Sequence, residues 1–256
     1  MIFADLALAR RLEAAEAANA RGCSGGDRAV LEIAGGWAIF SGAASPLTQA
    51  VGIGLHGPVR AAELDAIENF LARRGARVSL DLCPLADPTL IEALAGRGYH
   101  ATEFNNVLVK PLAGGSMVFT PRVRRAIAGE ADLWSHTVGR GFFEQVELTT
   151  AEMDVGRAIF AMPEALCYLA TGENGHPAGG AAAAVRDGLA ILFADTTIEP
   201  YRRRGLHREL IAARLNEAMA LGCDLATAST APGSASQRNY ERMGFQVVYT
   251  KVTLVS

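Results

Sequence analysis

The two halves of this chain carry the same signals in the same order, and this repeat constrains the fold more than any single motif does. Residues 97–100 read Arg-Gly-Tyr-His and residues 243–246 read Met-Gly-Phe-Gln, so that their glycines stand 146 positions apart (244 − 98). Upstream, with a slip of one residue, the pattern predicts helices over 61–74 and 206–221, each ending at a glycine and leading into a strand. The ordered series predicts two copies of one strand–helix–strand–helix–strand unit.

The turn residues and the apolar pattern predict a mixed sheet with helices on its faces, which is the α/β class. The Glu-Asn-Gly at 173–175 indicates an antiparallel hairpin. Asp87 followed by Pro88 is typical of a helix start, as is Ser234 or Ser236. The expected helices are 6–20, 61–74, 88–98, 131–139, 206–221 and 234–244, and the expected strands are 29–33, 36–40, 50–55, 77–82, 107–109, 165–171, 178–186, 189–198, 224–229 and 253–255.

The composition is that of an ordinary globular protein and disfavours several classes of function. Half of the 256 residues are hydrophobic and 20% are charged, and the net charge of −3 gives no global preference for nucleic acid or for an anionic membrane. The four cysteines lie far apart and the five histidines are scattered, so we expect no metal site, no disulfide framework and a reducing, cytoplasmic location. No apolar run approaches the roughly 20 residues that cross a bilayer, and no secretory signal is expected.

A punctuated segment separates the two repeats. Residues 111–116 read Pro-Leu-Ala-Gly-Gly-Ser, a composition typical of a linker. The chain length suits one large domain or two small ones. We therefore expect an N-terminal lobe at 1–112 and a C-terminal lobe at 117–256. Because the duplication already supplies a pseudo-dimer, a monomer and a homodimer are both compatible with the sequence.

The segment 199–208, Glu-Pro-Tyr-Arg-Arg-Arg-Gly-Leu-His-Arg, joins an expected strand to an expected helix and has the residues of an anion site. The first N–H groups of a helix have no intrahelical partner and the helix dipole is positive at that end, so a phosphate placed there gains several hydrogen bonds. Gly205 lets the backbone approach closely, and the arginines around it add positive charge. The alternative is a solvated basic turn at the start of a surface helix.

Two motifs of the second half resemble those of the GCN5-related N-acetyltransferases, the GNAT family. The family's pyrophosphate loop, Arg/Gln-x-x-Gly-x-Gly/Ala after a Val-x-Pro-like segment, is matched by Ile-Glu-Pro at 198–200 and by Arg-Arg-Arg-Gly-Leu-His at 202–207, where His207 replaces the small last residue. The family's helix with Asn and Tyr before a Gly-Phe is matched at 234–245, its Asn standing 34 positions after the loop glycine (239 − 205). The motifs lie within 117–256, and the repeat makes the whole chain resemble two tandem GNAT-like acyl-CoA N-acyltransferase folds.

The resemblance implies a cofactor site made of the residues that match the two motifs. These are Ile198, whose backbone would pair with the pantetheine arm, Arg203, Arg204, Gly205, Leu206, His207 and Arg208, which would hold the pyrophosphate, and Asn239, which would hydrogen-bond the pantetheine. For His207 the alternative is a tolerated residue at a helix N-terminus, and for Asn239 it is an ordinary amide on a helix surface.

The resemblance also implies the catalytic residues. Tyr240 would lie near the CoA sulfur as general acid, with a core tyrosine that packs its helix as the alternative. Asp195 or Glu199 would take the proton of the amine, directly or through water, if a dedicated base is needed at all. For Glu199 the alternative is an exposed turn residue.

The first half has lost the features that bind the cofactor. Its counterpart of the loop, 56–60, reads His-Gly-Pro-Val-Arg, without an arginine cluster, and Pro58 removes a backbone donor. Its last expected helix lacks the Asn-Tyr pair. We expect the first lobe to bind no cofactor, to support the structure and to shape the acceptor cleft.

The resemblance implies an N-acetyltransferase (EC 2.3.1.-) that moves an acetyl group from acetyl-CoA, as co-substrate and without a metal, to an amine. The acceptor stays open among small-molecule amines and the amines of peptides or proteins. A non-catalytic acyl-CoA-binding sensor or scaffold is the alternative, although binding alone needs no acid at the position of Tyr240. A P-loop nucleotide-binding protein is disfavoured because the chain has no Gly-Lys-Ser/Thr after a glycine-rich loop.

Overall fold

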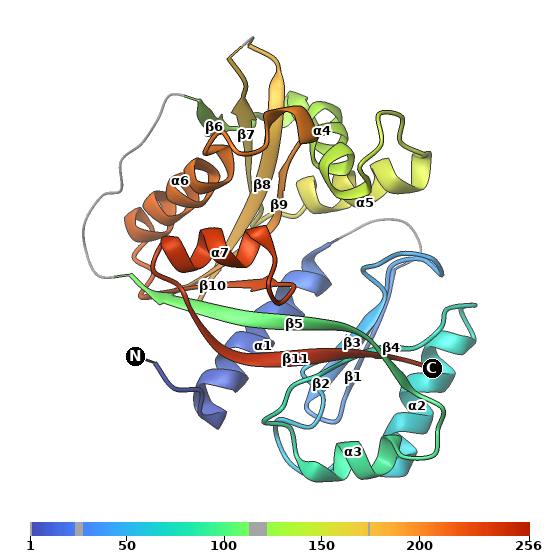
Figure 1. Cartoon of the computed structure of the whole chain (residues 1–256). Coiled ribbons are helices and arrows are strands. Elements are labelled where there is room, and N and C mark those ends of the chain that lie inside the picture. Colours follow the sequence, from blue (N-terminus) through green and yellow to red (C-terminus); the bar gives the residue numbers. More distant parts are fainter. Residues whose placement is uncertain (1, 24–27, 113–121, 174) are drawn as a thin grey trace. The chain divides into compact units, whose positions relative to one another are not determined.

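The structure, a computed structural model, describes residues 2–23, 28–112, 122–173 and 175–256. It divides into two compact units, Met1–Val107 with Val247–Ser256 and Leu108–Gln246 (Figure 1). The contacts thus group the last strand of the chain with the first unit. Most of the expected linker, 113–116, lies outside the described residues, and the two lobes expected from the sequence stay a prediction.

The first unit is a mixed sheet with three helices. Its elements are α1 (Leu6–Gly22), β1 (Ala29–Ile33), β2 (Gly36–Phe40), β3 (Gln49–Val51), α2 (Ala61–Ala72), β4 (Ser79–Leu82), α3 (Pro88–Leu94), the first part of β5 (His100–Pro111), and β11 (Gln246–Val255), and the strand order is β1-β2-β3-β4-β11-β5. Strands β3 and β4 are parallel, whereas β1–β2, β2–β3 and β4–β11 are antiparallel. Leu64, Ile67 and Leu71 recur on one face of α2 and are fully buried in the core of this unit.

The second unit repeats this arrangement. Its elements are β6 (Val123–Arg125), α4 (Ala131–Phe143), α5 (Thr150–Phe160), β7 (Leu166–Thr171), β8 (Pro177–Arg186), β9 (Leu189–Thr197), α6 (Leu206–Ala220), β10 (Leu225–Thr230) and α7 (Ala235–Arg242), with 3₁₀ turns at Ala128–Glu130 and Glu199–Tyr201. The strand order is β6-β7-β8-β9-β10, followed by the end of β5, and β9 and β10 are parallel. Figure 1 shows α6 and α4 on opposite sides of β8, whose residues 178–184 are buried throughout.

The predicted elements are confirmed with few exceptions. All six expected helices are present, and the mixed sheet of the expected α/β fold is found in both units. Asp87 accepts a hydrogen bond from the Thr89 N–H (3.0 Å) and Ser234 accepts one from the Gln237 N–H (3.1 Å), as helix caps do. Residue 174 of the expected hairpin turn lies outside the described residues. In the described part of the chain, no helix is long and apolar enough to cross a bilayer.

The last strand of each repeat pairs with the other repeat's strands. If each repeat kept its own last strand, β4 would neighbour β5 and β10 would neighbour β11. Instead β4 pairs with β11, with Leu82 opposite Val252, and β10 neighbours β5. The Thr227 hydroxyl donates to the Leu108 carbonyl at 3.0 Å, which ties β10 to the end of β5. Each unit therefore needs a strand from the other half of the sequence.

A buried group of charges holds β11 in the first unit. Lys251 is 1% exposed, and its Nζ lies 2.5 Å from Glu16 Oε2, 3.4 Å from Asp81 Oδ2 and 3.7 Å from Glu13 Oε2. The Tyr249 hydroxyl donates to Glu13 Oε1 at 2.7 Å. Burial raises the pKa of Glu13 to about 6, although the charge of Lys251 lowers it.

The raised pKa of Glu13 predicts a contribution to stability that falls as pH rises. The folded chain holds this proton up to about pH 6, whereas the unfolded chain loses it near pH 4.5, so the contribution is lost between these values and amounts to about 2 kcal/mol. Urea unfolding at pH 4 and pH 7 measures it. The free energy of unfolding of the native chain, relative to that of Glu13→Gln, should decrease over this interval.

The control is the same substitution at Glu92, which is exposed on α3. Relative to Glu92→Gln, the native chain should show no such change between the two pH values. Equal pH dependence in the native chain and in Glu13→Gln would contradict the assignment.

Candidate functional site

The loop between β9 and α6 ends in a helix start that no side chain caps. Gly205 is the N-cap residue of α6, and its φ of +83° is a conformation that residues with a Cβ rarely adopt. Arg203 also has a positive φ, +63°. The N–H groups that follow, of Leu206, His207 and Arg208, have no intrahelical acceptor because they belong to the first turn. The loop therefore presents a row of free donors at the positive end of the helix dipole.

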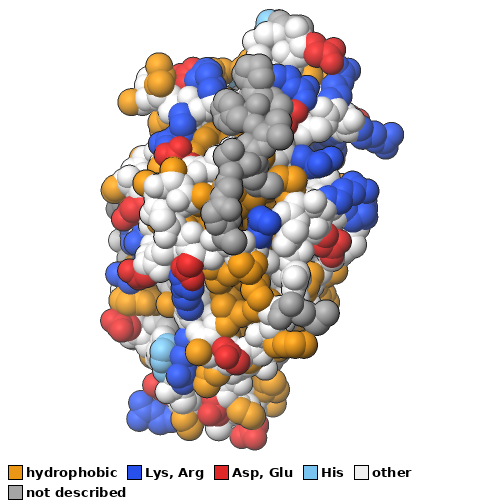
Figure 2. Space-filling model, turned by 90° about the vertical axis from the view of Figure 1, so that its left-hand side faces the viewer, with side chains coloured by type: hydrophobic (Ala, Val, Ile, Leu, Met, Phe, Trp, Pro, Cys, Tyr) orange, Lys and Arg blue, Asp and Glu red, His pale blue; other side chains and the backbone are white. Residues whose placement is uncertain are grey.

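The arginines of this loop divide into two pairs. Arg202 binds Glu144 (2.8 Å) and donates to the Thr197 carbonyl (3.0 Å), and the side chain of Arg204 lies 3.5 Å from Glu173. Arg203 and Arg208 are exposed and form no hydrogen bond or ion pair with the residues that the structure describes. Arg203 and Arg208 are therefore available for an anion. Figure 2 shows Lys and Arg side chains gathered over the upper part of the face on the α6 side.

A further arginine, which the sequence analysis missed, neutralises the acidic residue in the first turn of α6. Arg122 precedes β6 and forms two hydrogen bonds with the Glu209 carboxylate, one of them at 3.1 Å from Nε to Oε2. Its Nη2 also donates to the Arg204 carbonyl at 3.2 Å. A carboxylate at Glu209 alone would repel an anion, and Arg122 offsets its charge. Because 87 positions separate the two residues, no pattern of neighbouring residues could have predicted this contact.

A β-bulge redirects the chain just before this loop. Gly180 pairs with Thr196 and Ala182 pairs with Phe193, so that one residue of β8 faces two residues of β9. Ala194, one of these two, has a φ of +54°. The parallel pairing of β9 with β10 ends at Leu192 and Ala228, and among the described residues β9 continues without a strand partner on that side.

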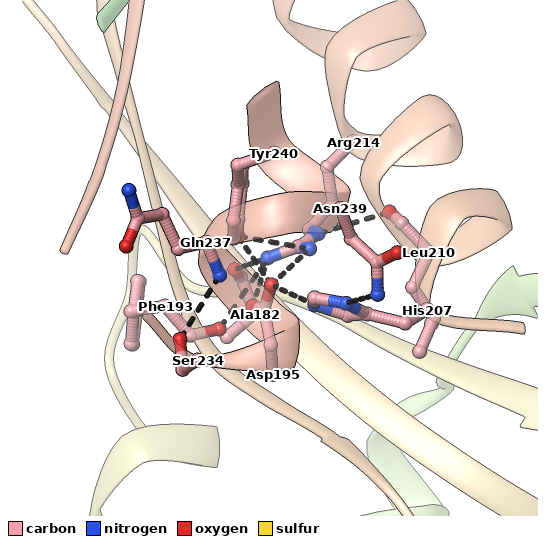
Figure 3. Close-up of polar contacts among 10 residues, drawn as sticks. All are labelled: Ala182, Phe193, Asp195, His207, Leu210, Arg214, Ser234, Gln237, Asn239 and Tyr240. Atoms are coloured by element: carbon pink, nitrogen blue, oxygen red, sulfur yellow. Dashed lines mark hydrogen bonds and ion pairs between the residues drawn. The ribbon is translucent and has the colours of Figure 1, made fainter. Parts of the chain in front are cut away.

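At the bulge, the side chain of Asp195 points into a buried polar network (Figure 3). Both carboxylate oxygens of Asp195 bind Arg214 of α6, with Oδ2 2.7 Å from Nη2. The Tyr240 hydroxyl donates to the same Oδ2, and His207 Nε2 lies 3.0 Å from it. His207 Nδ1 in turn lies 3.0 Å from the Asn239 amide nitrogen. The motif residues of β9, α6 and α7 are thus joined in one connected set.

Burial and charge together fix the protonation of this network. Burial disfavours the ionised forms of Asp195 and Arg214, but their mutual attraction outweighs this, so the pKa of Asp195 is held well below its usual range and that of Arg214 above its usual range. Burial and the neighbouring Asp195 charge raise the pKa of Tyr240 well above its ordinary value. Asp195 is therefore a carboxylate with little tendency to take a proton, and Tyr240 is a phenol that keeps its own.

The predicted site residues fall into three groups in the structure. The loop residues 203–208 form the helix start described above, with His207 turned away from it toward Asp195. Tyr240 is 2% exposed, and its hydroxyl faces Asp195. Glu199 is exposed in the 3₁₀ turn after β9, whereas the side chain of Asp195 is 8% exposed.

Both backbone polar groups of Ile198 form hydrogen bonds within the chain. Its N–H donates to the Ala178 carbonyl and its carbonyl accepts from the Tyr201 N–H, both at 2.9 Å. Since the groups of adjacent strand residues point to opposite sides, the N–H of Thr197 faces away from β8. Thr197 therefore directs its N–H group to this edge of β9, while its carbonyl accepts a hydrogen bond from Arg202.

The equivalent helix start of the first unit carries an acidic side chain, and the backbone just before the helix is hydrogen-bonded within the unit. At the beginning of α2, Glu63 accepts a hydrogen bond from the Arg60 N–H (2.8 Å), and the Val59 N–H donates to the Thr89 hydroxyl (2.8 Å). Glu63 also puts a negative charge in the first turn. Two donors are used here, and the charge opposes an anion. Among the described residues of the chain, no group of three or more His, Cys, Asp or Glu side chains could hold a metal ion.

Comparison with known proteins agrees with this geometry. Residues 135–245 match the model of the Acetyltransferase (GNAT) family. A GCN5-related N-acetyltransferase from Kribbella flavida is 20% identical, with a TM-score of 0.71 over 97% of this chain and 95% of that one. A tandem GNAT protein from the clavulanic acid biosynthesis pathway is 15% identical, with a TM-score of 0.63 over 98% and 93%.

A third structure, a GCN5-related N-acetyltransferase from Sphaerobacter thermophilus, is 15% identical with a TM-score of 0.59, over 81% of this chain and 71% of that one. No curated protein matches the sequence significantly. At these identities the structures establish a shared fold, which extends over nearly the whole chain. Residues 135–245 thus form a domain of the GNAT family, and the chain shares its fold with solved GNAT structures, a tandem GNAT protein among them.

Proposed function

We propose that the second unit transfers an acetyl group from acetyl-CoA to an amine. The observation that carries this proposal is the uncapped start of α6, where Gly205 at positive φ is flanked by the unpaired Arg203 and Arg208. The match of residues 135–245 to the GNAT family supports acyl transfer from an acyl-CoA as the reaction class. The choice of acetyl as the acyl group and of an amine as the acceptor is the finer part of the proposal.

In this proposal the cofactor lies along β9 and ends at α6. The pyrophosphate would accept hydrogen bonds from the N–H groups of Leu206, His207 and Arg208, with the free arginines adding charge. The pantetheine arm would pair with the free edge of β9 at Thr197, in the manner of an added strand. Asn239 of α7 would hydrogen-bond one of its amides.

The reaction forms a carbon–nitrogen bond and breaks the carbon–sulfur bond of the thioester. The amine must lose a proton, and Asp195 is a poor acceptor because Arg214 holds its pKa low. Glu199 is exposed and is the remaining carboxylate of the predicted pair, with solvent water as the other acceptor. The acceptor amine belongs to a small molecule, a peptide or a protein.

The role of Tyr240 as general acid has a physical cost. After giving its proton to the sulfur, the phenolate would lie against the Asp195 carboxylate in a buried site. A thiol has an ordinary pKa of about 8.5, so the CoA thiolate can leave without a strong acid. We therefore propose that Tyr240 mainly orients Asp195. The same observation favours a second candidate function, an acyl-CoA-binding sensor or scaffold that presents no acid to the sulfur.

Binding of acetyl-CoA should depend on the free arginines. Reversing both charges in Arg203→Glu/Arg208→Glu should weaken binding by on the order of 100-fold or more, since each charge-assisted hydrogen bond contributes about 1.5–3 kcal/mol. Calorimetric titration measures the affinity and should give one site per chain. Arg73→Glu, at an exposed arginine at the end of α2, is the matched control. Two sites per chain, or equal affinities in both variants, would refute this placement.

Replacement of Tyr240 by Phe separates its two roles. If the hydroxyl only orients Asp195, Tyr240→Phe should lower the free energy of unfolding by about 1–3 kcal/mol and leave kcat within about tenfold of the native value. A general acid should instead contribute a factor of about 100 to 10,000 to kcat. Turnover with a panel of amines and urea unfolding measure the two quantities. A large loss of kcat with an unchanged free energy of unfolding would show that Tyr240 acts as the general acid. If the native chain turns over no amine of the panel, the acyl-CoA-binding sensor or scaffold is favoured instead.

A further inference from the structure

His207 occupies a position where the family's loop motif has a residue without a functional side chain, and the structure shows what the imidazole does there. The ring turns inward from the first turn of α6 and lies between Asp195 and Asn239 (Figure 3). Its side chain is 15% exposed, and it makes an edge contact with the Tyr240 ring at 5.6 Å between centroids. The ring is therefore held on three sides.

These partners determine which ring nitrogen carries the proton. Nε2 faces Asp195 Oδ2, which has no proton to give, so Nε2 must be the donor. Nδ1 faces the amide nitrogen of Asn239, which can only donate, so Nδ1 must be the acceptor. The arrangement is that of a neutral imidazole with its proton on Nε2.

The contact with His207 Nδ1 also gives the direction of the Asn239 amide. With its nitrogen bound to His207, the side chain presents its oxygen Oδ1 away from the ring. In the described residues, Oδ1 has no hydrogen-bond partner and is not enclosed. An oxygen in this position accepts a hydrogen bond from an N–H group, and the pantetheine arm carries two amide N–H groups.

We propose that His207 is a positioning residue for cofactor binding, which holds Asn239 Oδ1 toward the pantetheine and anchors its own ring on Asp195. The inference rests on the proposed function, since it needs a CoA derivative in the second unit. It assigns His207 a role that the phosphate loop alone would not require. The imidazole touches neither the thioester nor the acceptor.

Two substitutions of His207 each remove one of its two side-chain hydrogen bonds and keep the other. His207→Gln keeps a donor near the place of Nε2 and loses the acceptor toward Asn239. His207→Asn keeps an acceptor near the place of Nδ1 and loses the donor toward Asp195. We expect His207→Gln to keep the native unfolding midpoint and to raise the Kd of acetyl-CoA about five- to tenfold, the effect of one hydrogen bond. His207→Asn should lower the unfolding midpoint and bind acetyl-CoA more tightly than His207→Gln does.

A truncated ligand distinguishes this role from a general effect on the start of α6. Adenosine 3′-phosphate 5′-diphosphate keeps the pyrophosphate of CoA and lacks the pantetheine arm. Its Kd, measured by calorimetry, should be the same for the native chain and for His207→Gln. Equal weakening of both ligands would overturn the inference, because His207 would then act on the phosphate loop. Unchanged affinity for acetyl-CoA would also overturn it.

The tautomer provides an independent spectroscopic test. Nitrogen-15 spectra of the native chain, with His207 assigned by comparison with His207→Gln, should show the proton on Nε2 at neutral pH. A proton on Nδ1, or on both nitrogens, would reverse the direction of the Asn239 amide and overturn the inference. Failure of the native chain to bind acetyl-CoA at all is a separate result, which would refute the proposed function rather than the role of His207.

Discussion

The arrangement of the second unit depends on the buried ion pair between Asp195 and Arg214. Asp195 lies at the bulge of β9 and Arg214, with no exposed area, lies in the middle of α6. Arg214 also donates to the Ala182 carbonyl of β8 (3.0 Å), and Tyr240 ties α7 to the same carboxylate. Removing one member of such a pair leaves an uncompensated charge, at a cost of about 3–5 kcal/mol. The pair therefore sets where the start of α6 lies relative to the free edge of β9.

The same fold is used in two ways in this chain. In the second unit the first turn of α6 is left open, and Arg122 removes the charge of Glu209 from it. In the first unit Glu63 folds back on the start of α2, accepts a hydrogen bond from the Arg60 N–H and leaves a negative charge in the first turn. The difference lies in a few side chains at one helix end, because the surrounding strands and helices follow the same order. The two helix starts therefore differ in charge although the surrounding elements are alike.

Patterns of neighbouring residues predicted most helices and strands, but they did not predict contacts between residues far apart in the sequence. The caps at Asp87 and Ser234 and the order of elements could be read because neighbouring residues determine them. Helix α5 was missed although Thr149 and Glu152 form a capping box, which a search for that pattern would have found. The exchange of β5 and β11 could not be found, since either strand fits beside β4 by pattern alone.

In the candidate site, too, neighbouring residues predicted the motifs but not the long-range contacts. The two motifs identified the phosphate loop and the helix with Asn239 and Tyr240. The orientation of each side chain, however, depends on the bulge at Ala194, and this bulge has no sequence signature of its own. Amide hydrogen exchange with and without acetyl-CoA tests directly whether the start of α6, and not that of α2, holds the pyrophosphate. We expect acetyl-CoA to slow exchange at Leu206, His207 and Arg208 and to leave exchange at residues 61–63 unchanged. Slowed exchange at 61–63, or at neither helix start, would contradict this placement of the pyrophosphate.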